Sequence, residues 1–321
     1  MKKYLLVMAS LLLLASCKKE SEVEEKVAAV PVGKVKVERF DKQFYEAGPE
    51  GLSAVKAQYP YFFPPGNDDA VWIGKMKDPL LRELHSEVEK KFPNTTTLEQ
   101  DLQSMFQHTK FYFKNFREPK VVTLISEMDY NSRVIFTDSL LLISLDLYLG
   151  KDHRYYVDFP KYQSQGFEQS QIMPDVVSAF SMGKIAPPTD KTLLSEMIYY
   201  GKELYLKDLL IPDVSDENKI GYSKEQLGWA QANEAEIWRY FVDRKLLYDT
   251  DLKLPARFIS PAPFSKFYLE LDNESPGRIG QWLGWQIVRS YAENNKDVPL
   301  QQILAMDAKT IFDNSKYKPK K

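Results

Sequence analysis

The chain has 321 residues, with 43 lysines and arginines against 45 aspartates and glutamates, a formal net charge of −2. This slightly acidic balance argues against a nucleic-acid partner, which usually requires a basic face. Hydrophobic residues make up 44% of the chain and aromatic residues 13%, so a folded core is expected and an intrinsically disordered protein is excluded. No internal repeat and no Gly/Ser-rich hinge divides the chain, which favours one compact domain.

Residues 1–16 have the pattern of a secretory signal peptide that is removed on export. Two lysines open it, an apolar run over residues 4–14 follows, and small residues precede Cys17. The apolar run is shorter than the roughly 20 residues that a membrane-spanning helix needs. Leu-Ala-Ser-Cys resembles the lipobox at which bacterial lipoproteins receive their lipid and are cleaved. We therefore predict that Cys17, the only cysteine in the chain, becomes a lipidated N-terminus and anchors the protein to a membrane.

The sequence after this cysteine predicts a tether, a body and a tail. Residues 18–33 are polar and charged and contain no aromatic residue, so residues 17–33 are interpreted as the lipidated cysteine with a flexible tether. Fully extended, sixteen residues reach at most roughly 55 Å, so the body is expected to stay close to the bilayer. Residues 34–315 are predicted to form a single globular domain, and residues 316–321 a basic tail.

The predicted elements of the domain place the short strands before the three longest helices. Alternating or β-branched runs predict the strands, which we expect to form a small sheet with antiparallel pairs. Periodicity near 3.6 predicts the helices. The expected strands are residues 34–38, 121–126, 133–137 and 140–146, and the expected helices are residues 80–91, 97–110, 190–206, 223–247 and 277–294. This order indicates an α+β fold, mostly helical, with a small sheet in the N-terminal half.

Local signals mark the ends and contacts of the last two helices. The run from Ser223 to Gln226 is a capping-box pattern that begins a helix. Ser275 is the expected cap of the last long helix, with the following proline at its first position. Gly280 and Gly284 lie one turn apart, which predicts that another element approaches the backbone of this helix closely.

One of the predicted helices has the spacing of a zinc-peptidase helix without its metal ligands. Such a helix carries two histidines four residues apart, with a glutamate after the first as general base. Here Glu196 fills the glutamate position, but Ser195 and Tyr199 stand where the histidines would be. Neither a serine hydroxyl nor a tyrosine phenol ordinarily replaces imidazole as a zinc ligand. The three histidines of the chain also lack ligand spacing: they are His85, His108 and His153. We expect no catalytic residue, no metal and no cofactor.

A second glutamate leaves one catalytic alternative open. Glu234 interrupts the apolar stripe of the helix predicted over residues 223–247, so it must find a partner or stay protonated if it is buried. Glu196 and Glu234 could in principle form the carboxylate pair of a glycosidase. The alternative function is therefore an envelope hydrolase that acts on peptide or glycan through these two residues.

Four segments resemble the gliding-motility lipoproteins of the GldB family, found in Bacteroidetes. They are residues 38–41, 145–150, 193–202 and 282–291, and the likeness extends from about residue 35 to 315. The resemblance implies a lipid-anchored, non-catalytic component of the gliding-motility and type IX secretion machinery that binds protein or peptide. It implies other gliding and secretion proteins as partners, and an outer-membrane anchor with the body in the periplasm.

The same resemblance implies a degenerate zincin-like fold, because the family is distantly similar to zinc-peptidase-like proteins with a His-Glu-x-x-His motif. It places Ser195 and Tyr199 at the lost ligand positions and Glu196 at the position of the base. Glu234 then corresponds to the carboxylate ligand that such proteins take from the next helix. If Glu234 lies away from the other three, we expect a structural partner for it, such as Arg278 or Arg289.

Overall fold

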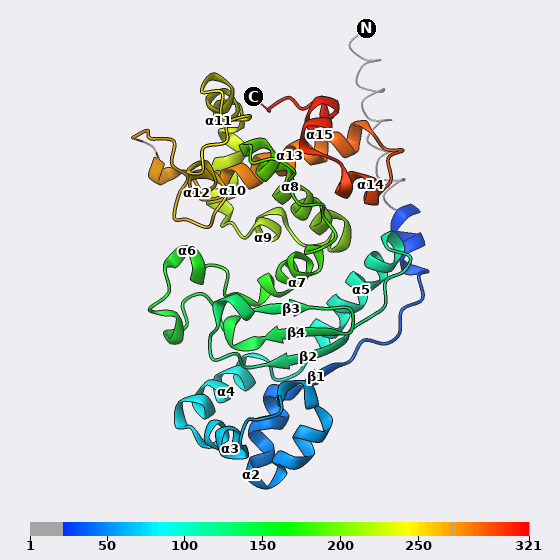
Figure 1. Cartoon of the computed structure of the whole chain (residues 1–321), viewed down its shortest axis with the longest axis vertical. Coiled ribbons are helices and arrows are strands. Elements are labelled where there is room, and N and C mark those ends of the chain that lie inside the picture. The colour runs from blue at the N-terminus through cyan, green and yellow to red at the C-terminus, as the bar shows by residue number, and fades with distance from the viewer. Residues whose placement is uncertain (1–21, 271, 321) are drawn as a thin grey trace, which may run out of the picture.

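Short runs of β-branched residues and leucines form a four-stranded sheet near the middle of an elongated molecule (Figure 1). The computed structural model describes residues 22–270 and 272–320. Its strands are β1 (Val37–Arg39), β2 (Lys120–Leu124), β3 (Val134–Phe136) and β4 (Leu140–Ser144), in the order β1-β2-β4-β3. Val121 and Val122 point to opposite faces of β2 and belong to different hydrophobic clusters, so the sheet is buried on both sides.

The pairing of the strands confirms one of the expected antiparallel pairs and shows that the other two pairs are parallel. Only β3 and β4 are antiparallel, whereas β1 and β4 both run parallel to β2. Val122 of β2 lies opposite Glu38 on one side and Leu142 on the other. Parallel neighbours need a long crossover connection. Between β1 and β2 this crossover includes four helices, of which only the last two were expected. The predicted fold class, mostly helical with a small sheet in the N-terminal half, is confirmed.

These four helices occupy and adjoin one end of the molecule. They are α2 (Phe40–Gln58), α3 (Asp69–Lys77), α4 (Pro79–Lys91) and α5 (Thr96–Tyr112). The bounds of α4 and α5 confirm the helices predicted there. Within α2 the chain bends at Gly48, which has a φ of 65°, and Pro49 follows it. This interruption explains why no continuous helical pattern is visible in the sequence.

The other end of the molecule is helical and is organised around α8 (Leu193–Leu210) and α13 (Ile279–Asn294) (Figure 1). A Cβ atom added to Gly284 would lie 1.9 Å from the carbonyl oxygen of Met197, so only glycine permits this contact. The predicted close approach to α13 is therefore confirmed. The remaining helices are α6 (Lys161–Ser164), α7 (Ile172–Ser181), α9 (Asp216–Ile220), α10 (Lys224–Ala232), α11 (Glu234–Asp243), α12 (Leu254–Phe258), α14 (Leu300–Ala305) and α15 (Ala308–Ser315). Helix α7 contacts both β3 and α8 and so joins the sheet to the helical end.

Two predicted helix boundaries differ from the structure, and one local signal is confirmed. The capping box from Ser223 to Gln226 is formed. The helix expected over residues 223–247 is two helices, because the chain leaves helical geometry at Asn233. Ser275 does not cap α13, because its hydroxyl bonds to the backbone of Ser265 and Asp272 instead. Arg278 occupies the cap position.

The first residues that the structure describes pack against α5. Residues 22–28 are helical, and the side chain of Val27 is 2% exposed. The Gln107 amide donates to the Ala28 carbonyl at 3.4 Å, and His108 Nε2 lies 3.3 Å from the Glu24 carboxylate. The part of the expected tether from residue 22 onward therefore contacts the body. The predicted signal peptide and Cys17 lie outside the described residues.

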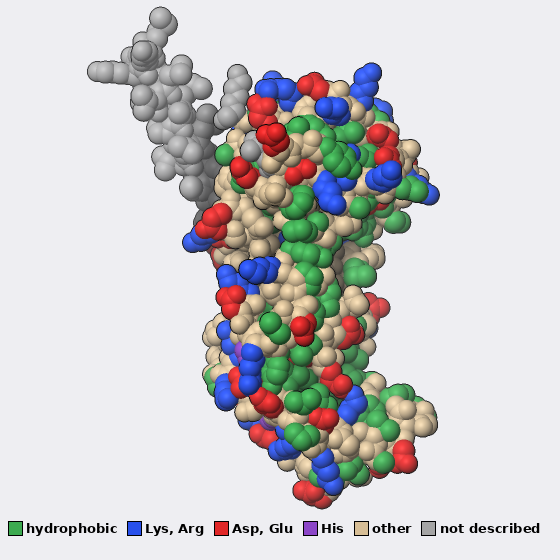
Figure 2. Space-filling view, turned by 90° about the vertical axis from the view of Figure 1, so that its left-hand side faces the viewer, with side chains coloured by type: hydrophobic (Ala, Val, Ile, Leu, Met, Phe, Trp, Pro, Cys, Tyr) green, Lys and Arg blue, Asp and Glu red, His purple; other side chains and the backbone are tan. Residues whose placement is uncertain are grey.

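Charge is dispersed over the face of the molecule that Figure 2 presents. Basic and acidic side chains alternate there, with hydrophobic side chains exposed between them. This dispersion agrees with the nearly balanced composition of the chain. Among the described residues, no helix has the length and the apolar composition needed to cross a membrane.

Candidate functional site

Three of the residues singled out from the sequence lie on the first two turns of α8: Ser195, Glu196 and Tyr199. Thr192 caps the helix by accepting a hydrogen bond from the Ser195 backbone N–H at 3.2 Å. The Ser195 side chain is buried and lies 3.1 Å from the Thr192 hydroxyl. Burial raises the pKa of Glu196. These three residues thus share one helix end, where Ser195 belongs to the cap.

Ser195 and Tyr199 also line a small cavity of about 60 Å³ against the connection between α14 and α15. Lys202, one turn further along α8, donates hydrogen bonds to the carbonyls of Leu304 and Met306 at 3.1 and 2.6 Å. Burial lowers the pKa of Lys202 to about 8. The ammonium group of Lys202 therefore serves as a structural hydrogen-bond donor to the carbonyl groups at the end of α14.

Glu234 takes part in a different contact. It is buried at the start of α11 and accepts a hydrogen bond of 2.6 Å from the Tyr317 hydroxyl. Burial and the hydrogen bond to this carboxylate raise the pKa of Tyr317. Neither Arg278 nor Arg289 contacts Glu234. Within the described part of the chain, no hydrogen bond, ion pair or shared cavity joins Glu234 to Ser195, Glu196 or Tyr199.

The residue types that bind metals are also scattered in the structure. His108 contacts Glu24, His153 lies 3.5 Å from Glu87, and His85 packs against the ring of Tyr45. Across residues 22–270 and 272–320, no group of three or more His, Cys, Asp or Glu side chains is placed to hold a metal ion.

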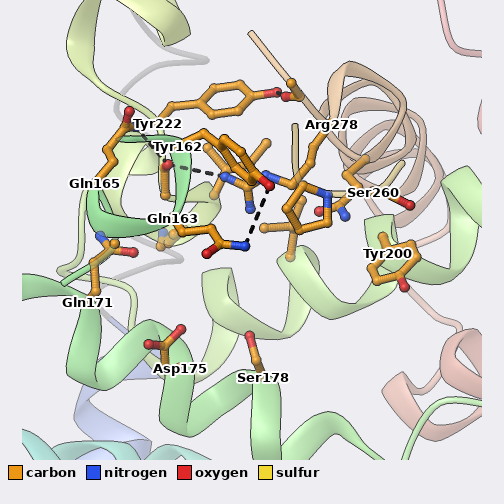
Figure 3. Close-up of a pocket in the computed structure, with 18 of the residues that line it drawn as sticks. Tyr162, Gln163, Gln165, Gln171, Asp175, Ser178, Tyr200, Tyr222, Ser260 and Arg278 are labelled. Atoms are coloured by element: carbon orange, nitrogen blue, oxygen red, sulfur yellow. Dashed lines mark hydrogen bonds between the residues drawn. The ribbon is translucent and has the colours of Figure 1, made fainter. Parts of the chain in front are cut away.

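A polar pocket of about 340 Å³ opens where α7, α8 and α9 meet the loop that precedes α13 (Figure 3). Its walls come from segments far apart in the sequence and present amide, phenol and charged groups. Tyr162, Gln163, Gln165 and Gln171 lie on one side, Arg278, Ser260 and Tyr200 on the other, with Asp175 and Ser178 below. Arg133, Glu203, Lys207, Lys219, Tyr222 and Gln226 also line it.

The backbone at Arg278 is held in an unusual conformation. Its φ is 61°, in the left-handed region that costs a residue other than glycine of order 1 kcal/mol. The preceding Gly277 packs so closely that an added Cβ would lie 2.1 Å from the Ala262 carbonyl oxygen. Its own carbonyl accepts a hydrogen bond of 2.6 Å from the buried Tyr222 hydroxyl, and the Ile279 N–H donates to Ser265 Oγ. These contacts fix the direction from which Arg278 enters the pocket.

The Arg278 side chain differs from the other cations of the pocket. One of its terminal nitrogens donates to the Gly221 carbonyl at 3.2 Å, and its guanidinium lies 5.5 Å from the centre of the Tyr222 ring. No carboxylate among the described residues pairs with it. The other cations all have acidic partners: Arg133 with Asp175 at 3.2 Å, Lys207 with Glu203 at 3.5 Å, and Lys219 with Asp208 at 3.1 Å.

The two acidic side chains of the pocket are held by several bonds each. Asp175 also accepts a hydrogen bond of 2.8 Å from Tyr148, and Glu203 accepts one of 2.7 Å from Ser178. Lys207 is buried, which lowers its pKa, and it donates to the Lys219 carbonyl at 2.9 Å. The pocket therefore combines fixed acidic groups with one guanidinium whose remaining N–H groups can bind an anionic group.

A family model described as gliding motility protein GldB matches residues 18–319. The chain belongs to the GldB family. This match confirms the resemblance inferred from the four segments, and it assigns the chain to gliding motility and to a family of lipoproteins. Searches of the curated proteins and of the solved structures found no match, so the zincin-like similarity stays a prediction.

Sequence reasoning did not find the polar pocket of this GldB family member. Its residues come from positions between 130 and 281 and form no motif of fixed spacing. Two weak signals exist in hindsight. One is the run of glutamines and serines over residues 163–171, and the other is Pro-Gly-Arg immediately before α13. Neither signal shows that the two segments face each other.

Proposed function

We propose that this chain is a lipid-anchored component of the gliding-motility machinery and of its linked type IX secretion system. It acts without catalysis, by binding a peptide segment of a partner protein in the polar pocket. The family match supports the place in gliding motility. The lipidated residue is Cys17, and the anchor holds the body on the periplasmic side of the outer membrane.

The conformation and pairing of Arg278 are the observation on which the binding function rests. A side chain that is held in place and has no acidic partner can meet a carboxylate of a ligand with two parallel hydrogen bonds. Its neighbours suit the rest of a peptide, because glutamine side chains both donate to carbonyls and accept from N–H groups. Tyr162 and Tyr200 add ring surface for apolar side chains.

The proposal of a non-catalytic protein is supported by the state of the acidic groups. Asp175 and Glu203 are engaged in ion pairs and hydrogen bonds, which fix their orientation. Glu196 and Glu234, the residues of the hydrolase alternative, share no contact, and no geometry of the described residues favours that alternative. A binding site is the simpler use of the pocket.

The test replaces Arg278, the cation without an acidic partner, and measures how much partner protein is crosslinked to the pocket. Arg278→Gln keeps a side chain that can donate to the Gly221 carbonyl but removes the positive charge. The control is Arg244→Gln, because Arg244 is exposed on the surface at the end of α11. A photo-crosslinking residue at Tyr162 reports the ligand in intact cells.

We expect Arg278→Gln to reach normal protein levels, to lose the crosslinked partner by at least tenfold and to impair gliding. The control should retain both. A partner that is captured equally by Arg278→Gln and the control, with normal gliding, would contradict the assigned role of the pocket.

A further inference from the structure

A second, wider hollow of about 1060 Å³ lies beside the end of α5. The loop after α5, the turn between β3 and β4, and the end of α7 line it. Its floor is aromatic: the rings of Phe113, Phe116 and Phe136 each lie within 6 Å of the Phe180 ring, with centres 5.4, 5.9 and 5.3 Å apart. We call this hollow the aromatic groove.

Three basic side chains and one acidic side chain, Asp138, line the aromatic groove, so its charge is positive on balance. Lys114, Arg117 and Lys184 line the rim and are exposed, and none of them has a carboxylate partner among the described residues. Lys114 and Lys184 lie over aromatic rings, 5.0 Å from the centre of Phe111 and 5.4 Å from that of Phe180. Met182 projects from the same rim and is 74% exposed. Cations and an exposed apolar side chain around aromatic rings match the polar and apolar layers of a membrane interface.

The groove lies next to the point where the chain leaves for Cys17. Residues 22–28 run antiparallel to the end of α5, because Ala28 contacts Gln107 while Glu24 contacts His108. Tyr112, the last residue of α5 and part of the groove, is one turn further on. Four residues separate Cys17 from Glu22, and chain geometry limits them to roughly 18 Å. A lipid on Cys17 therefore keeps this side of the body at the bilayer.

We propose that the aromatic groove is the surface through which the protein lies on the membrane. Anionic phospholipid headgroups bind Lys114, Arg117 and Lys184, and Met182 enters the interface. This inference rests on the proposed lipid anchor at Cys17. Each lysine or arginine near an anionic surface strengthens its attraction by about fivefold, so three cations suffice to orient a body that is already tethered.

The first experiment uses the complete lipidated protein in vesicles that contain phosphatidylglycerol. Cys17 is the only cysteine, and its thiol is consumed by the lipid, so one introduced cysteine can carry an environment-sensitive dye. The test sites are Asn115→Cys and Met182→Cys in the groove. The control is Leu80→Cys on α4, whose side chain is 70% exposed.

We expect the dyes at 115 and 182 to shift their emission to the blue and to be quenched by spin-labelled lipid, while the dye at 80 remains in water. Dyes at 115 and 182 that behave like the dye at 80 would overturn the proposal. Crosslinking of position 115 to a protein in cells, without contact to lipid in vesicles, would equally overturn it in favour of a protein partner.

Charge reversal tests whether the cations of the groove, and not the net charge of the whole protein, are responsible for contact with the membrane. The combined variant Lys114→Glu, Arg117→Glu and Lys184→Glu should abolish the shift at position 182. The matched variant Lys77→Glu, Lys151→Glu and Lys253→Glu changes three exposed lysines elsewhere and should leave the shift intact. Equal effects of the two variants would contradict a specific surface. The mass of the purified protein tests the anchor independently, because an unmodified Cys17 would refute the lipidation itself.

Discussion

Glu234 shows how a single buried carboxylate is accommodated in this fold. Its position in an apolar stripe predicts burial and the need for a partner, and both are present. The partner is Tyr317, 83 residues later, and not an arginine on α13. Arg289 instead binds Asp208 and Asp216, with distances of 2.7 and 2.8 Å. A sequence indicates that a buried charge needs a partner, but chain folding decides which residue supplies it.

Glu196 distinguishes the binding function from the hydrolase alternative. Because this carboxylate lies on α8 without a described ion pair, Glu196→Gln should change neither the protein level nor the spreading of gliding cells. Burial already raises the pKa of Glu196, so a neutral side chain is tolerated at this position. Colony spreading, measured at matched protein levels, checks this prediction. Loss of spreading at a normal protein level would support a catalytic or ligand-binding role for Glu196.

At the scale of elements, one aspartate holds the connection that follows β2. Asp146 accepts hydrogen bonds from the N–H groups of Ser126 and Met128 at 2.9 and 2.7 Å. Glu127 and Met128 both have a φ near 60°, so these bonds hold two consecutive left-handed residues. Burial raises the pKa of Asp146 to about 6. The desolvated carboxylate is thus the cost of fixing this turn.

This pKa gives a pH dependence with a definite sign. The folded value of about 6 exceeds the unfolded value near 3.9, so the folded state binds more protons between these pH values. The stabilising effect of Asp146 is complete below pH 4 and is lost as the pH rises through 6, by roughly 3 kcal/mol. Chemical denaturation between pH 4 and 7 should show this slope, and Asp146→Asn should flatten it. An unchanged slope in the variant would refute the assignment to Asp146.

The contact between α8 and α13 makes a second prediction for elements. Gly284→Ala would place a methyl group against the Met197 carbonyl, so the helices must separate at a cost of roughly 1–3 kcal/mol. Gly228→Ala on α10 is the control, because nothing lies within 4 Å of its added Cβ and alanine favours a helix. The free energy of unfolding should therefore fall for the first variant and not for the second. Equal values for both would show that the helix pair adjusts freely.

The elements that the sequence predicted are those decided by neighbours in the chain. The capping box at Ser223 and the helices α4, α5 and α8 follow from local patterns, and they are present. The parallel strands, the cap of α13 and the polar pocket depend on residues that meet only after folding. Arg278 replaces Ser275 as the cap because Ser265, ten residues upstream of Ser275, binds the serine hydroxyl. No local pattern contains that information.

At the scale of the whole molecule, the predicted anchor decides where the protein is found. Cys17→Ser removes the only thiol that can carry a lipid, so the chain should leave the membrane fraction. Fractionation of cells, with the protein detected in each fraction, measures this. The matched control is Ser21→Ala, which changes a residue four positions beyond the cysteine and leaves Cys17 intact. Retention of Cys17→Ser in the membrane would contradict the anchor.

The packing of residues 22–28 on α5 has a consequence for how the protein meets its partners. If Cys17 carries the predicted lipid, this packing keeps the body close to the bilayer and restricts how it turns above the surface. A partner in the same membrane then meets the protein by diffusion in two dimensions. Its high local concentration compensates for a low intrinsic affinity. A weak ligand for the polar pocket would suffice if it is carried in the same membrane, whereas a freely diffusing one would have to bind far more tightly.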